Sequence, residues 1–159
     1  MNKHNIHRAV AVAAVAVAAL VPAVANAGGG SKTETLRFFD KTQSLILTRA
    51  DGTVIDHAPY PEAAPGDTLD LYSVDYAGNH KRHAARYSAS NHLRCVFGTG
   101  EPTCVSHVAI GDSLLIIEGN PGTIVGGTGR FLGATGRVVT FTELPGDVGA
   151  DVALKVRRR

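Results

Sequence analysis

The sequence has few of the residues on which several common chemistries depend. Its 159 residues include no tryptophan, one methionine and two cysteines, Cys95 and Cys104. Two cysteines are too few for a structural zinc site, and their separation is not that of a CxxC redox pair. No GxSxG nucleophile elbow occurs in the chain. We therefore expect no metal, no cofactor and no activated nucleophile.

An excess of basic charge is also missing once the N-terminal segment is set aside. Residues 1–27 have a short basic start, an apolar run from Ala9 to Val21 and the small-x-small ending Ala25-Asn26-Ala27. This pattern is typical of a cleaved secretion signal, and the run is shorter than the ~20 residues of a membrane span. The segment holds two of the 16 basic and none of the 14 acidic residues. We predict one secreted, formally neutral domain at 28–159, without a stable membrane span or a nucleic-acid partner.

Helical periodicity is absent after residue 27. Instead, short runs rich in Val, Ile, Leu, Thr, Tyr and Phe alternate with Gly, Pro, Asn and Asp. This punctuation indicates an all-β meander, and about eight or nine strands suit a closed barrel or a sandwich. The predicted strands are Leu36–Phe39, Ser44–Arg49, Thr68–Tyr76, Arg82–Phe97, Cys104–Ile110, Ser113–Glu118, Thr123–Val125, Arg137–Leu144 and Asp151–Val156.

The two cysteines allow strand register to be predicted. In an exported chain, two cysteines nine residues apart favour a disulfide, which would place Cys95 opposite Cys104 and His92 opposite His107. The two-residue turn Gly111-Asp112 then places Leu115 opposite Val108. Because side chains alternate along strands, one face carries Leu93, Cys95, Cys104, Val108, Ile110, Leu115 and Ile117, which we assign to the interior. The other face carries His92, His107, Leu114, Ile116 and Glu118.

The second face is partly apolar because it includes Leu114 and Ile116. Strands that are apolar on both faces are usually buried on both. An oligomer interface would cover this face, and so would a flanking loop. His92 and His107 on this face would offer a metal two ligands, and without a third we predict no metal site.

Five polar residues are predicted to point into the interior and to contact a ligand. If Leu69 and Leu71 point inward, the alternation places the candidates on the same face: Ser73, Asp75, Tyr87, Asn91 and Ser106. Asp75 and Tyr87 would form an acid–base pair for a bound molecule. The alternative is that these groups hydrogen-bond to one another or to water near a barrel mouth.

Residues 126–136 read GGTGRFLGATG, a glycine density that raises the question of phosphate binding. A phosphate loop requires a following helix, whereas Arg137-Val138-Val139-Thr140-Phe141-Thr142 predicts a strand. We assign a structural role instead, in which glycines form a barrel corner and Phe131 fills one barrel end. The structural residues are Gly126, Gly127, Gly129, Phe131, Gly133 and Gly136.

This stretch resembles the GGTG-[KRx]-[FY]-x-G-A-x-G signature of the dirigent and allene oxide cyclase-like proteins. The resemblance extends to Asp112-Ser113-Leu114-Leu115-Ile116-Ile117-Glu118-Gly119 and to Pro65-Gly66-Asp67, and it is strongest over residues 66–156. It implies an eight-stranded antiparallel β-barrel that commonly forms trimers. Plant members of the family cyclise an unsaturated fatty-acid epoxide or guide the coupling of phenoxy radicals.

The residues and the resemblance together predict a secreted barrel that forms a trimer or dimer. We expect it to bind a small hydrophobic molecule and to guide its cyclisation, isomerisation or coupling, as an isomerase or cyclase would. The alternatives are a non-catalytic module that binds a small ligand and a structural barrel of the cell surface with a filled interior. An open cavity with an acidic wall would favour catalysis, and a filled interior would exclude a ligand.

Overall fold

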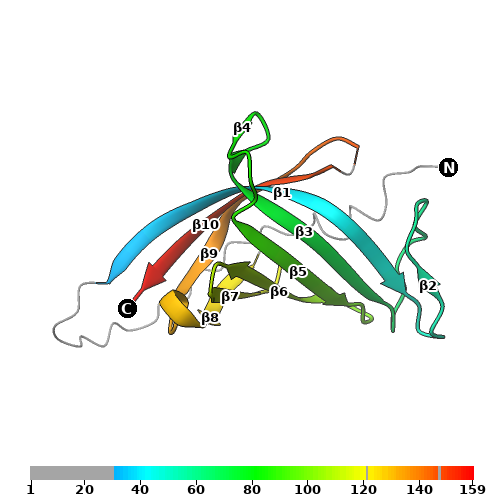
Figure 1. The fold of residues 1–159 in the computed structure, drawn as a ribbon. Coiled ribbons are helices and arrows are strands. Elements are labelled where there is room, and N and C mark those ends of the chain that lie inside the picture. Colours follow the sequence, from blue (N-terminus) through cyan, green and yellow to red (C-terminus); the bar gives the residue numbers. More distant parts are fainter. Residues whose placement is uncertain (1–30, 121, 147) are drawn as a thin grey trace.

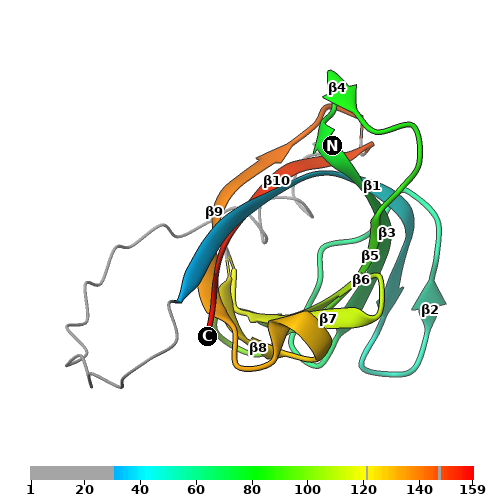
Figure 2. The ribbon, with the colours of Figure 1, turned by 60° about the vertical axis from the view of Figure 1, so that its left-hand side comes forward.

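Strands are the main secondary structure of the protein in a computed structural model that describes residues 31–120, 122–146 and 148–159. The predicted signal, residues 1–27, lies outside the described residues. Eight strands form an antiparallel barrel in the order β1-β10-β9-β8-β7-β6-β5-β3, and pairing of β1 with β3 closes it (Figures 1 and 2). The bounds are β1 Lys32–Thr48, β2 Val54–Ile55, β3 Thr68–Asn79, β4 Arg82–His83, β5 Ala89–Val96, β6 Thr103–Ile110, β7 Ser113–Glu118, β8 Thr123–Gly127, β9 Thr135–Glu143 and β10 Gly149–Arg158. No helix in these described ranges has the length and apolar character needed to cross a membrane.

Strand β1 is one strand where the sequence predicted two. Its polar centre, Lys41 to Gln43, does not break the strand, because a β-bulge between Thr42 and Ser44 absorbs one extra residue in the pairing with β3. Asp40 lies before this bulge and Leu45 and Leu47 lie after it, opposite Asp75, Leu71 and Leu69. A single 17-residue strand can therefore bond to β10 along its first part and to β3 along its second.

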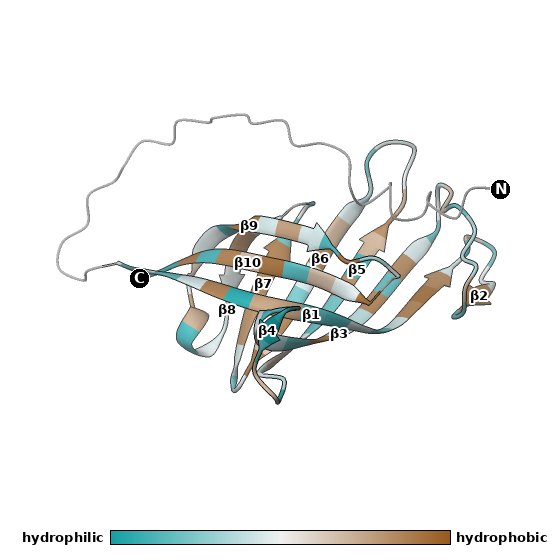
Figure 3. Ribbon diagram, turned by 90° about the horizontal axis from the view of Figure 1, so that it is seen from above, coloured by the Kyte–Doolittle hydropathy of each residue, from teal (hydrophilic) through white to brown (hydrophobic). Residues whose placement is uncertain are grey.

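The predicted register of the three central strands is confirmed. Cys95 is paired with Cys104, His92 with His107, and Val108 with Leu115. The predicted disulfide is present between β5 and β6. The face assigned to the interior is buried at Cys95, Cys104, Val108, Leu115 and Ile117. Figure 3 shows the alternation of hydrophobic and hydrophilic residues along the strands that produces these two faces.

The prediction of one strand over Arg82–Phe97 is wrong. Only Arg82 and His83 form β4, which pairs with β3 in a hairpin outside the barrel, and β5 begins at Ala89. Residues 82–88 are exposed, so no apolar face holds them to the sheet. The hairpin is instead fixed by His83, which packs on Phe39, and by His80, whose backbone N–H donates a hydrogen bond to Asp151 of β10 at 2.7 Å.

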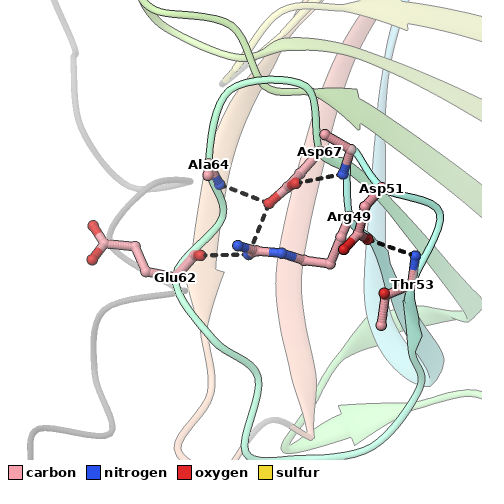
Figure 4. A network of polar contacts seen from close by, with 7 residues as sticks. Arg49, Asp51, Thr53, Glu62, Ala64 and Asp67 are labelled. Carbon is pink, nitrogen blue, oxygen red and sulfur yellow. Dashed lines mark hydrogen bonds and ion pairs between the residues drawn. The ribbon is translucent and has the colours of Figure 1, made fainter.

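The short strand β2 belongs to a segment outside the barrel, between the predicted strands Ser44–Arg49 and Thr68–Tyr76, where the sequence predicted no strand. Asp67 anchors this segment, because its buried carboxylate accepts hydrogen bonds from the backbone N–H groups of Ala50, at 3.0 Å, and Ala64, at 2.7 Å. Arg49 completes the network with an ion pair to Asp67 at 2.9 Å and a hydrogen bond to the carbonyl oxygen of Glu62 (Figure 4). The loop between β2 and β3 is thereby held against the end of the barrel that contains the disulfide.

The buried apolar side chains form two clusters inside the barrel. One contains Phe131, for which an end-filling role was predicted; it is fully buried and belongs to the 3-10 turn Gly129–Phe131 between β8 and β9. The other contains Leu47, Leu69 and the disulfide.

The glycine stretch forms the corner between β8 and β9, and the strand predicted after it is present as β9. Gly127 has no room for a side chain, because a Cβ atom there would overlap the carbonyl oxygen of Leu114 and lie 2.8 Å from Cβ of Phe131. Gly136 has φ +151° and an added Cβ would overlap the carbonyl oxygen of Lys155. These two glycines allow the close backbone approach that the corner requires.

Candidate functional site

A cavity lies inside the barrel between the two apolar clusters. It has a volume of about 100 Å³. This is room for several waters or one small organic molecule. The apolar wall consists of Phe38, Leu93, Cys104, Val108, Ile117, Val138, Phe141, Val152 and Leu154. The polar side chains at the cavity are Asp40, Asp75, Asn91, Ser106 and Asn120.

Two aspartates face each other across neighbouring strands at the cavity wall. Asp40 of β1 is paired with Asp75 of β3, and their carboxyl groups share a hydrogen bond. The side chain of Asp40 also accepts hydrogen bonds from Ser73 Oγ, at 2.7 Å, and from Asn91 Nδ2, at 3.3 Å. Ser106 Oγ donates to Asn91 Oδ1 at 2.5 Å. Strands β1, β3, β5 and β6 therefore contribute to one polar network.

Burial controls the protonation of this pair. Asp40 is 9% exposed and Asp75 3% exposed. Burial raises the pKa of Asp40, although hydrogen bonds from Ser73, Asn91 and Asp75 oppose the increase. Burial, followed by the negative charge of Asp40, raises the pKa of Asp75 to about 8. Near neutral pH Asp75 is therefore protonated, and its neutral carboxyl group can donate a hydrogen bond to Asp40.

The cavity opens to solvent beside strand β9. Three of its lining residues are exposed: Gly119 and Asn120 in the turn after β7, and Phe141 of β9. A β-bulge in β9, at the shift opposite Ala153 and Leu154, places Val138 and Phe141 on the same side of the strand. Phe141 thus lines the cavity while remaining 48% exposed at its mouth. A small molecule could enter here and reach the aspartate pair.

The structure brings together four of the five polar residues that the sequence singled out. Asp75, Asn91 and Ser106 line the cavity, and Ser73 is buried against Asp40. Tyr87 does not join them, and its predicted interior position is wrong. It lies in the exposed segment before β5, where the alternation used to place it does not apply, and it is 62% exposed.

Sequence reasoning missed Asp40, the partner of Asp75. The predicted strand ended at Phe39, one residue short of the carboxylate. A signal was available, because Asp40 lies two residues after Phe38, and residues two apart share a strand face. Extending the strand by one residue would have placed an acid on the interior face.

The histidine pair of the outer face lies away from the cavity. His92 Nε2 is 2.7 Å from Asp70 Oδ1, and the His92 ring stacks on Tyr72 with ring centres 4.4 Å apart. His107 is exposed. Within the described part of the chain, no group of three or more His, Cys, Asp or Glu residues is arranged to hold a metal ion.

Comparisons with known proteins support the fold. No family model and no curated protein matches the sequence. Among solved structures, a pyocyanin demethylase superposes with a TM-score of 0.58 at 12% identity, covering 77% of this chain and 99% of its own. A pterocarpan synthase dirigent protein superposes with a TM-score of 0.53 at 18% identity, covering 83% of this chain and 87% of its own. The predicted dirigent-like eight-stranded barrel fold is confirmed.

Proposed function

We propose that this dirigent-like barrel is a secreted isomerase that binds a small, mostly apolar molecule in its cavity. In this proposal the Asp40–Asp75 pair moves a proton between two atoms of the bound molecule. The observation that carries the proposal is a buried pair of facing carboxyl groups, both with raised pKa values, at the wall of a mostly apolar cavity. Carboxyl groups with raised pKa values are suited to general acid–base chemistry near neutral pH.

The proposed reaction needs no group beyond the two carboxyls. Asp75 donates its proton to an acceptor atom of the molecule, such as a carbonyl or epoxide oxygen. The Asp40 carboxylate removes a proton from a carbon near that atom, and the electron pair of the broken C–H bond forms a new π bond or closes a ring. Proton return through the pair restores the starting state, so the molecule is rearranged without a change in its composition.

The surroundings of the pair fit this role. Ser73 and Asn91 fix the Asp40 carboxylate by hydrogen bonds, so that it need not reorganise when it receives a proton. The apolar wall would hold the molecule beside the pair. The two structural neighbours are named as a demethylase of pyocyanin and a synthase of pterocarpan, which agrees with a small-molecule role for the barrel.

The assembly of the protein is part of the same proposal. Leu114 and Ile116 on the outer face of β7 are partly exposed in the single chain. A homo-oligomer, a trimer or a dimer, would cover them, as the sequence predicted.

The proposal can be tested without knowledge of the natural substrate. Cyclohexanone is a neutral ketone of a size that the cavity accommodates, and its α-hydrogens exchange with D2O only through the enol. We expect the protein to accelerate this exchange, measured by NMR, with a decline above pH about 8 as Asp75 loses its proton. Asp75→Asn and Asp40→Asn should each lower the protein-dependent rate by about 100-fold or more. Asp56→Asn, at an exposed acid outside the cavity, should leave the rate unchanged.

Binding is measured in parallel by saturation-transfer NMR on the same ketone. Ser106→Phe, which fills the cavity, should abolish both binding and exchange in a protein whose circular dichroism is unchanged. Binding without any protein-dependent exchange would contradict catalysis and identify a non-catalytic binding module. Absence of binding to the wild-type protein would contradict both and identify a structural barrel.

A further inference from the structure

We infer that the cavity selects organic cations: its ligand carries a positive charge on an apolar ring, which rests between the aspartate pair and the aromatic wall. This inference depends on the proposed binding function and adds the charge class of the ligand. It follows from the two carboxyl groups and the two phenylalanine side chains that line one small cavity.

The first observation is a charge imbalance. Asp40 and Asp75 line the cavity, whereas no Lys, Arg or His is present among the described residues that line it. Ser73 and Asn91, which donate hydrogen bonds to Asp40, are neutral. The ion pairs found in the described ranges involve other acids. The negative charge of the pair thus faces the cavity without a basic partner.

The low-dielectric surroundings of this charge strengthen its attraction for a cation. Buried charges are usually paired, because low-dielectric surroundings solvate them poorly. A cation that enters the cavity would supply the missing partner, and its attraction to the pair would be screened little by solvent. An anion would meet repulsion from the same pair and would lose its own hydration.

The aromatic wall is a second and independent observation. Phe38, buried in β1, and Phe141, at the mouth, both line the cavity. The face of an aromatic ring attracts cations, and this attraction increases when water is excluded. A cation with its charge spread over a ring satisfies both the carboxyl pair and the apolar wall, whereas a small hydrated metal ion would leave the wall uncovered.

The test uses three probes of similar size and different charge: N-methylpyridinium, toluene and benzoate. N-methylpyridinium and toluene have nearly the same shape and differ by the positive charge. In NMR titrations we expect N-methylpyridinium to bind at least about tenfold more tightly than toluene. Benzoate should compete with neither. The preference for the cation should persist in about 0.5 M salt, because salt screens a buried pair of charges little. Binding to exposed acids would be screened at this concentration.

Two variants locate the effect. Asp40→Asn should reduce the preference for N-methylpyridinium over toluene to about threefold or less while toluene binding is retained. Asp56→Asn should keep the full preference, since Asp56 is exposed and does not line the cavity. Equal binding of N-methylpyridinium and toluene, or loss of the preference in high salt, would overturn the inference and leave the proposed function standing. If toluene and cyclohexanone also fail to bind, the proposed function fails as well.

Discussion

Asp75 is an acidic side chain whose surroundings favour its neutral form. Its side chain is buried beside a second carboxyl group, that of Asp40. Its ordinary pKa of 3.8 is raised to about 8, so folding binds a proton that the unfolded chain releases at neutral pH. The site is therefore maintained against a cost in stability, as is common where function requires a buried ionisable group.

This cost predicts how stability depends on pH. Between about pH 4 and pH 8 the folded state holds the Asp75 proton and the unfolded state does not, so the free energy of unfolding falls as pH rises. The slope is up to about 1.4 kcal/mol per pH unit for one proton. The groups that contact the pair, Ser73 of β3 and Asn91 of β5, do not titrate in this range.

Urea unfolding of wild type and Asp75→Asn at pH 5.5, 6.5 and 7.5 measures this slope. We expect the wild-type free energy of unfolding to decrease more steeply than that of Asp75→Asn, whose amide can donate to Asp40 without losing a proton. Asp56→Asn should follow the wild-type slope. Parallel profiles for wild type and Asp75→Asn would show that Asp75 does not take up a proton on folding.

At the scale of the elements, the corner between β8 and β9 offers a matched pair of neighbouring glycines. An added Cβ at Gly126 would meet no atom within 4 Å, whereas at Gly127 it would overlap the backbone of Leu114. We expect Gly127→Ala to lower the free energy of unfolding by about 1–3 kcal/mol because the corner must open. Gly126→Ala should change it by no more than about 0.5 kcal/mol. Chemical denaturation of both variants checks this, and equal effects would contradict the close approach at Gly127.

The same elements show what the sequence could predict and why. The disulfide fixed one pair of residues and Gly111-Asp112 fixed the next turn, so the register of β5, β6 and β7 followed by counting. Counting residues along the strands failed where the pairing between two strands shifts or ends. The bulge after Thr42 joins two predicted strands into β1, and the exposed segment before Ala89 separates β4 from β5.

The candidate site was predicted in part for the same reason. Asp75, Asn91 and Ser106 lie on regular strand segments, where alternation places their side chains correctly. Tyr87 lies outside any strand, so local pattern could not place it. Asp40 follows the regular alternation from Phe38 and was missed because the predicted strand ended at Phe39. Asp40 lies opposite Asp75 because β1 pairs with β3. The local sequence pattern of either strand does not determine this pairing.

At the scale of the whole molecule, export, the disulfide and assembly can be measured together. Native mass spectrometry of the protein recovered from the medium of an expressing culture should show a chain that begins at Gly28. Its mass should be two hydrogens below that of the reduced chain, because Cys95 and Cys104 are joined. The intact species should be a trimer or a dimer. Retention of residues 1–27, or a monomer at all concentrations, would contradict secretion or assembly respectively.

The pairing of β1 with β10 determines when the barrel can close during synthesis of the chain. Lys32, the first residue of β1, is paired with Arg158, the last residue of β10. While the chain is being synthesised, β1 can pair with β3 early, but its other edge has no partner until the last strand emerges. Val152 and Leu154 of that strand also line the cavity. A nascent chain that stops before Gly149 would thus lack the partner of this edge of β1, and the cavity is completed only by β10.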